Sequence, residues 1–413
     1  MDHNMKKIAS LLTMTISALL LTACGGGDGS SSSNPPIPDE KPNLENQQGR
    51  LLILTEDPDR PQLNLYDLAQ KQTIHNAQLS FNPSAIHASA GYRYGVLMNR
   101  TQGIVNFYDS GLTLNKGNIS SQTPQLLKYQ LNGASPTHYR NFNDQAAIFY
   151  DGNNDQSSKF DVFKDQDIFN NSVASQSLPF KHHGVAEPRG DLVLSTYLAD
   201  GQSKVSIVKS YGIHGDHFHE QQTLSNPCSG LHGASSIQKF SAFGCEDGVL
   251  VVEQQGQKFT DFKISLPVRI GTVVGHHLAP NLVALASTTP DLFIIDPILK
   301  NTNQIQWVND PTTTRLKQIY SSSGKFFVVL DSKGVLNIFD SKTWELKTRL
   351  NVIDAQSPDL TKTQLVANGR ADEVYLNDIQ NKSIIQVDLK TGAIKQTIQL
   401  NTVPNQFTWL GVI

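Results

Sequence analysis

The chain from residue 49 onward consists of short apolar runs separated by small polar turns. The runs are rich in Val, Ile, Leu, Phe and Tyr, and Gly, Asn, Asp or Ser lies between them. Short apolar runs bounded by turn residues are typical of β-strands. No long amphipathic helical pattern interrupts them, so residues 49–413 are predicted to form an all-β fold.

The runs are grouped into a repeated unit. Each unit has a small polar approach, a first strand, a turn, an apolar strand, another turn and a strand that often ends in Asp. A repeat of about 45 residues with three or four strands is the signature of a β-propeller blade. Seven full units are recognised, at residues 86–109, 137–163, 182–208, 231–253, 276–296, 316–340 and 365–389.

The two ends of this region complete an eighth unit. Residues 50–79 provide the second, third and fourth strands of a blade, and residues 404–413 provide a first strand with nothing after it. Joining them closes the ring and covers two sheet edges that would otherwise be open to pairing. We therefore predict an eight-bladed β-propeller closed by the N-terminal strands and a C-terminal strand, with seven blades as the alternative.

The N-terminus has the features of an export signal. Residues 1–23 combine a basic start with a short apolar run, which is typical of a signal peptide. The run ends in Leu-Thr-Ala-Cys, which resembles a bacterial lipobox in which Cys24 becomes the lipidated N-terminus; a plain secretory signal is the alternative. Residues 24–48 contain Gly, Ser and Pro with almost no apolar side chains, so they are predicted to be a flexible tether. Gly25, where Asp would favour the inner membrane, indicates a periplasmic protein anchored at the inner face of the outer membrane.

Charge and cysteine content narrow the class of protein. The formal net charge is -3 at pH 7, which argues against a nucleic-acid surface. With Cys24 lipidated, Cys228 and Cys245 remain, and a cysteine pair in an exported protein predicts a disulfide. Two zinc-binding thiolates are the alternative.

Histidines recur in register with the blades. Because the first strand of each blade lines the channel, side chains at the same point of successive blades form a ring around one of its ends. Clustered imidazoles repel one another when protonated, whereas zinc accepts nitrogen and carboxylate ligands. Residues His182 and Glu187 are further candidates beside this ring, and the alternative is that such polar side chains bind loop backbone groups. Five histidines occupy the predicted strand entries, about one blade apart: His87, His138, His183, His232 and His277.

A second cluster lies in the segment Tyr-Gly-Ile-His-Gly-Asp-His-Phe-His-Glu. Its candidate metal ligands are His214, Asp216, His217 and His219. Histidine-rich tracts bind cations, while a solvated loop is the alternative. Its place between two blades predicts that it reaches over the mouth of the channel.

Several segments together resemble the AztD-type periplasmic zinc metallochaperones. The most specific are "HHGVAEPRGD" and the pair "CSGLHGAS" and "FGCEDGVLV", joined by "AAIFYDG" and "GHHLAP". The resemblance implies a β-propeller that holds Zn(II) and passes it to the solute-binding protein of a zinc ABC importer, without catalysis. It also implies that His183 and His232 are ligands, followed by His182, His138 and His277, and that the cysteine pair is the family disulfide. The tether here has no histidine, in contrast to the His/Asp-rich N-terminal segment of that family.

Two other functions stay open at this point. Propellers also include metal-dependent hydrolases and lactonases, and lipid-anchored propellers serve as interaction scaffolds. Copper and nickel accept imidazole ligands as well as zinc. We expect a monomer that meets the membrane through the lipid on Cys24.

Overall fold

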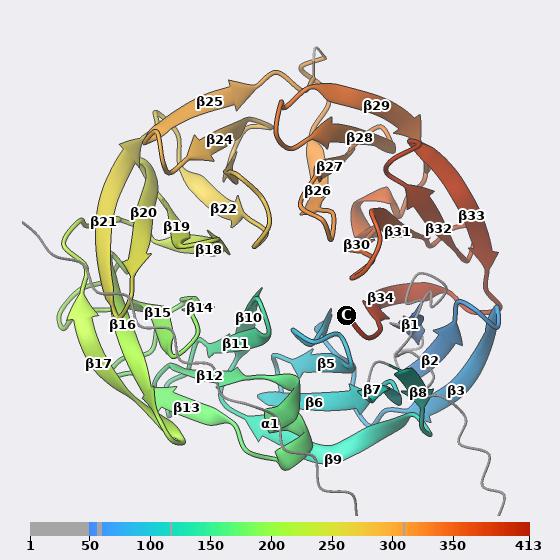
Figure 1. The fold of residues 1–413 in the computed structure, drawn as a ribbon, viewed down its shortest axis with the longest axis horizontal. Helices are drawn as coiled ribbons and strands as arrows, with labels where there is room; N and C mark the ends of the chain where they lie inside the picture. The colour runs from blue at the N-terminus through green and yellow to red at the C-terminus, as the bar shows by residue number, and fades with distance from the viewer. Residues whose placement is uncertain (1–48, 56–59, 116–117, 309) are drawn as a thin grey trace, which may run out of the picture. The chain divides into compact units, whose positions relative to one another are not determined.

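The computed structural model of the protein describes residues 49–55, 60–115, 118–308 and 310–413. The predicted signal peptide, the lipidation at Cys24 and the tether lie outside these residues. In the described part, eight four-stranded antiparallel sheets form a ring, which confirms the predicted eight-bladed β-propeller (Figure 1). No helix in these ranges is long and apolar enough to cross a membrane.

The first four blades contain the following strands, given from the innermost to the outermost. Blade 1 consists of β34 (Pro404–Leu410), β1 (Arg50–Thr55), β2 (Gln62–Asp67) and β3 (Gln72–Gln78). Blade 2 consists of β4 (Ala85–Ala88), β5 (Tyr94–Asn99), β6 (Ile104–Asp109) and β9 (Gln125–Asn132), with the hairpin β7 (Leu112–Asn115) and β8 (Asn118–Ser121) inserted. Blade 3 consists of β10 (Pro136–Phe142), β11 (Gln145–Tyr150), β12 (Lys159–Phe163) and β13 (Ala174–Ser177), with helix α1 (Asp165–Asn170) before the last strand. Blade 4 consists of β14 (Ala186–Pro188), β15 (Leu192–Tyr197), β16 (Ile207–His214) and β17 (His217–Thr223).

The other four blades follow the same plan without crossovers. Blade 5 consists of β18 (His232–Ile237), β19 (Phe240–Cys245), β20 (Gly248–Gln255) and β21 (Lys258–Ser265). Blade 6 consists of β22 (Ile270–Val274), β23 (Leu282–Ala286), β24 (Leu292–Asp296) and β25 (Asn301–Ile305). Blade 7 consists of β26 (Arg315–Tyr320), β27 (Phe326–Asp331), β28 (Val335–Asp340) and β29 (Leu346–Asn351). Blade 8 consists of β30 (Leu365–Ala367), β31 (Glu373–Asp378), β32 (Ser383–Asp388) and β33 (Ala393–Gln399), preceded by a 3₁₀ helix (Leu360–Lys362).

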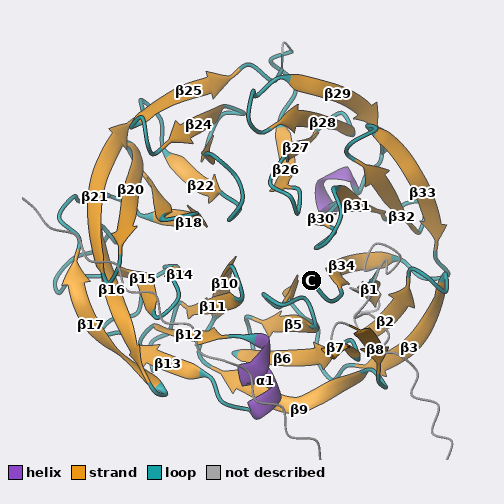
Figure 2. Ribbon diagram, viewed as in Figure 1, coloured by secondary structure: helices purple, strands orange, loops and turns teal. Residues whose placement is uncertain are grey.

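Burial differs between the middle and the outer strands of a blade. Every residue of β5, β11 and β19 is buried, whereas β29 and β33 are mostly exposed or half-buried. Both faces of a middle strand pack against neighbouring blades, which explains why these strands are continuous apolar runs in the sequence. The core therefore lies between the blades, and strands joined by loops, with little helix, make up the described structure (Figure 2).

The ring is closed by pairing the two ends of the propeller, as predicted. Strand β34 is antiparallel to β1, with Trp409 opposite Leu51 and both side chains fully buried. The chain therefore ends at the innermost strand of blade 1, near the centre of the ring (Figure 1).

The innermost strands carry irregularities that affect the site. Register shifts occur near the start of β10, β18, β22 and β26. Such bulges turn a side chain out of the regular alternation and are frequent next to functional sites. Two of these strands, β10 and β18, carry histidines at the shift, namely His138 and His232.

Candidate metal centre

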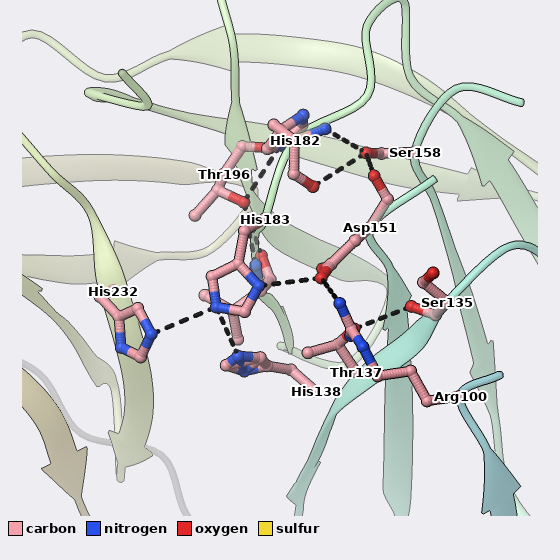
Figure 3. A network of polar contacts seen from close by, with 11 residues as sticks. Arg100, Ser135, Thr137, His138, Asp151, Ser158, His182, His183, Thr196 and His232 are labelled. Atoms are coloured by element: carbon pink, nitrogen blue, oxygen red, sulfur yellow. Dashed lines mark hydrogen bonds and ion pairs between the residues drawn. The ribbon is translucent and has the colours of Figure 1, made fainter. Parts of the chain in front are cut away.

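Three histidines from three consecutive blades converge with their Nε2 atoms (Figure 3). Residue His138 is on β10, His183 is in the loop before β14, and His232 begins β18. The Nε2 atom of His183 lies 3.2 Å from that of His138 and 3.2 Å from that of His232. All three ligand atoms lie within 4.8 Å of one another, and this is the single such group of metal-binding side chains among the described residues. We call these residues the histidine triad.

Hydrogen bonds at the far side of two rings fix their tautomers. The Nδ1 atom of His183 is 2.9 Å from Oδ2 of Asp151, and Nδ1 of His232 is 2.7 Å from the carbonyl oxygen of Gly271. A carboxylate and a carbonyl accept hydrogen bonds only, so each Nδ1 carries the hydrogen. In the neutral rings, both Nε2 atoms are therefore bare and present lone pairs to each other.

The carboxylate of Asp151 is itself held in place. It follows β11, accepts a 2.9 Å hydrogen bond from Arg100, and only 9% of its side chain is exposed. Burial, the largest influence, raises the pKa of Asp151, but hydrogen bonds from His183 and Arg100 outweigh it and the pKa is lowered overall. Asp151 is thus anionic at neutral pH and orients the His183 ring.

The third ring, that of His138, is half-buried. Burial, followed by the nearby Arg140 guanidinium, lowers the pKa of His138 to about 3. This imidazole is therefore neutral at physiological pH, which leaves a nitrogen lone pair available to a cation without loss of a proton.

The neighbouring His182 lies apart from the triad. Its ring is 8% exposed, with Nδ1 3.0 Å from the Phe180 carbonyl oxygen and Nε2 3.2 Å from the Thr196 carbonyl oxygen. Burial lowers the pKa of His182, although the two backbone contacts act in the opposite direction. Its ring packs edge-on against Phe149 at 5.2 Å between centroids. The structure gives His182 partners in the backbone and none in the triad.

The ring of five histidines predicted from the sequence is reduced to three, because two members are out of register. His87 pairs with Val96, the third residue of the second strand of blade 2. In blade 3, the residue that pairs with the third residue of the second strand, Ala147, is Arg140. His87 is therefore two residues farther along its strand than His138 and stacks on Tyr139 at 4.7 Å. Burial, followed by Arg140, lowers its pKa to about 4.

The prediction that His277 enters a first strand is wrong. The first strand of blade 6 is Ile270–Val274, so His276 and His277 follow it and lie at its opposite end. The start of this strand, at Gly271, is the end that meets His232. The blade begins before the predicted unit 276–296, because its five-residue first strand precedes the two histidines.

Glu187 is buried away from the triad. Its side chain is 1% exposed, accepts a 2.8 Å hydrogen bond from Ser236 and lies 3.5 Å from Nε of Arg140. Burial raises its pKa, and Arg140 opposes this. Its contacts indicate that Glu187 neutralises Arg140 below His138, at the level of His87.

The predicted disulfide is present in the structure. Cys228 and Cys245 are bonded to each other and are fully buried. The residue before Cys245, Gly244, pairs with His232, so the bond supports the strand that carries a triad residue.

The second cluster lies on the hairpin of β16 and β17, the outermost strand of blade 4. The expectation that it covers the channel mouth is therefore wrong.

Two cavities are lined by histidines that the sequence predicts as site residues. One, of about 490 Å³, is lined by inner-strand residues including His87, Arg140 and Lys317. The other, of about 370 Å³, is lined by His183 and His232 together with Lys204, Glu246 and Arg269, among others. The second cavity gives the triad an opening on the side of blades 4 and 5.

Comparison with known proteins agrees with this architecture. No protein-family model matches the chain. The curated zinc chaperone AztD of Citrobacter koseri is 26% identical over 388 residues, which cover 87% of this chain and 82% of AztD. The solved structure of apo AztD from Citrobacter koseri matches with a TM-score of 0.73 at 19% identity, covering 88% of this chain and 98% of that chain. The chain folds as an AztD-type β-propeller. The dihydro-heme d1 dehydrogenase NirN has a TM-score of 0.56 at 11% identity over 91% of this chain and 76% of its own, so its likeness to this AztD-type propeller concerns the fold alone.

One residue of the site is absent from the sequence prediction. Asp151 directly follows the apolar strand β11, and β11 is antiparallel to β10. The end of a second strand therefore lies beside the start of the first strand, where His138 is located. In this AztD-type propeller, an Asp immediately after an apolar second strand is the signal that could have identified it.

Proposed function

We propose that the protein is a periplasmic zinc metallochaperone. It holds Zn(II) on His138, His183 and His232 and delivers the ion to the solute-binding protein of a zinc ABC importer. The name of the curated relative, a zinc chaperone, supports the choice of cargo. The arrangement of the triad and its hydrogen-bond partners supports the choice of residues.

The observation that carries this proposal is the contact between His183 and His232. Their Nε2 atoms are 3.2 Å apart, while Asp151 and Gly271 hold the hydrogens on the Nδ1 atoms. Two bare lone pairs at this distance repel unless a positive charge lies between them. A metal ion supplies that charge without changing either tautomer.

The spacing of the triad fits zinc. Zinc binds histidine nitrogen at about 2.0–2.1 Å in tetrahedral geometry, which places neighbouring ligand atoms about 3.3 Å apart. Two of the three contacts in the triad are 3.2 Å. The carboxylate–histidine pair of Asp151 and His183 is the arrangement that commonly orients a zinc-bound imidazole.

Three protein ligands leave one position of a tetrahedral ion open. The cavity of about 370 Å³ reaches His183 and His232, so a ligand from an acceptor protein can approach the ion from this side. Stepwise replacement of the triad by acceptor ligands then moves zinc without releasing it to water.

An open position is also a feature of catalytic zinc sites, so hydrolysis is the second candidate. A hydrolase needs a free base beside the metal-bound water. Of the described residues that line this cavity, Glu246 is the one carboxylate, and Lys204 and Ser229 already bind it. The carboxylate of Asp151 is engaged by His183 and Arg100. These contacts favour a carrier over an enzyme.

The location belongs to the same proposal. Lipidation at Cys24 anchors the propeller to the inner face of the outer membrane, and residues 24–48 act as the tether. The buried Cys228–Cys245 disulfide supports an oxidising compartment such as the periplasm.

The proposal is tested by zinc titration against a competing chelator of known affinity. Wild-type protein is expected to bind zinc tightly, and H183A/H232A to bind it more than about 100-fold more weakly, because loss of outer partners alone costs 10–100-fold. His75→Gln on β3 is the matched control, since His75 contacts Tyr108 far from the triad. Equal zinc affinity in wild type and H183A/H232A would show that these two histidines do not bind zinc. Delivery is tested separately: transfer to the solute-binding protein must be faster than zinc dissociation into a chelator.

A further inference from the structure

The hairpin of β16 and β17 presents three imidazoles on one face. His214 is directly opposite His217 in the antiparallel register, and His219 is two residues farther along β17. Directly opposed residues share a face of a sheet, as do residues two apart on a strand. Phe218, between the two histidines, is 4% exposed and points into the core. The histidine side chains therefore lie together on the solvent side.

Two of the three rings, those of His217 and His219, are already close enough to share an ion. The Nε2 atoms of His217 and His219 are 3.2 Å apart, the same spacing as in the triad. The His214 ring centroid is 4.9 Å from that of His219. The Oδ1 atom of Asp216 is 3.0 Å from Nδ1 of His217, so this ring also carries its hydrogen on Nδ1 and directs a bare Nε2 toward His219.

The backbone supports this arrangement. Gly215 has a φ of 65°, which the tight two-residue turn between the strands requires. Gly212 faces His219, and the side chain of Gln221 occupies the space that a Cβ on Gly212 would need. The carbonyl oxygen of Asp216 accepts a 3.1 Å hydrogen bond from Ser175 of blade 3, which fixes the hairpin tip against its neighbour.

We propose that His214, His217 and His219 form an exposed site for a divalent transition-metal ion, separate from the triad. Imidazole nitrogen ligands suit Cu²⁺, Ni²⁺ and Zn²⁺, and at one set of ligands Cu²⁺ binds more tightly than Zn²⁺. His217 and His219 form the pair that holds the ion, and a rotation of the His214 ring completes the set. Because β17 is the outermost strand of its blade, the ion exchanges directly with solution.

The test uses zinc and copper titrations of the full propeller with two variants. H217N/H219N removes the hairpin pair, and H183A/H232A removes two triad residues. Glu220→Gln is the matched control, because Glu220 is exposed on the same strand and binds Lys209. All variants are first compared with wild type by thermal unfolding without metal, so that a loss of the fold is distinguished from the loss of a metal site.

The expected result is that H217N/H219N binds one metal equivalent fewer than wild type, while E220Q binds the full number. H183A/H232A is expected to retain one equivalent, and its Cu²⁺ form to show nitrogen couplings in the electron paramagnetic resonance spectrum. The site is overturned if H217N/H219N and wild type bind the same number of ions, or if H183A/H232A binds no metal. Failure of the triad alone leaves the hairpin result unaffected, so the two proposals are distinguished.

Discussion

The carboxylate of Asp151 and the ring of His183 are joined at 2.9 Å although they belong to different blades. Asp151 follows β11 of blade 3, and His183 precedes β14 of blade 4. Arg100, from blade 2, completes the contact. The orientation of one triad ring therefore depends on the packing of three consecutive blades.

Substitution of Asp151 by Asn is expected to weaken zinc binding about 10–100-fold. The amide keeps the size of the side chain but removes the negative charge. That charge orients the His183 ring and makes its Nε2 atom a better electron-pair donor to the metal ion. Competition titration measures the change. Asp155→Asn, an exposed residue of the following loop, is the matched control. Unchanged affinity in D151N would show that this contact does not support the ion.

Substitution of His182 by Ala is expected to lower stability without removing zinc. Both of its ring nitrogens face backbone carbonyls, and the ring packs on Phe149. Loss of a buried ring of this size costs about 2–4 kcal/mol. Denaturant unfolding measures the loss, and zinc titration of the folded variant measures binding. A folded H182A protein that no longer binds zinc would make His182 a ligand after all.

The fold can be predicted because each blade has a recognisable pattern in its local sequence. A middle strand buried on both faces has to be apolar throughout, and a turn has to contain small polar residues, so the units repeat visibly. Closure follows from the incomplete units at the two ends. The same repeat predicts His138 and His232, since both lie near the start of a first strand.

The rest of the site depends on the pairing register of the strands, which the sequence repeat does not specify. His87 and His138 both follow an extended approach, but the pairing of β4 and β5 places His87 two residues farther along. His277 looked like a strand entry because the strand before it, β22, is short. Asp151 reaches His183 across a blade boundary, a contact that depends on how blades pack against each other.

Removal of the disulfide is expected to lower the free energy of unfolding by about 3 kcal/mol. Cys228 and Cys245 are 17 residues apart, and closing a loop of this length reduces the entropy of the unfolded chain by roughly that amount. C228A/C245A is compared with wild type by denaturant unfolding. Because Gly244 pairs with His232, zinc affinity is expected to fall as well. A double variant that unfolds at the same denaturant concentration contradicts the prediction.

The metal-free protein is expected to lose stability as the pH falls from 6.5 toward 4, in part through His87. Burial lowers its pKa from 6.5 to about 4, so in this window the unfolded chain binds a proton that the folded state does not. Stability then decreases with falling pH, and the loss levels off below the folded pKa. Between pH 7 and pH 5 this one group accounts for roughly 1–2 kcal/mol. The measurement is denaturant unfolding of wild type and His87→Gln at both pH values in the presence of a chelator. H87Q should lose less stability than wild type by about that amount, and an equal loss in the two proteins would mean that His87 is protonated in the fold.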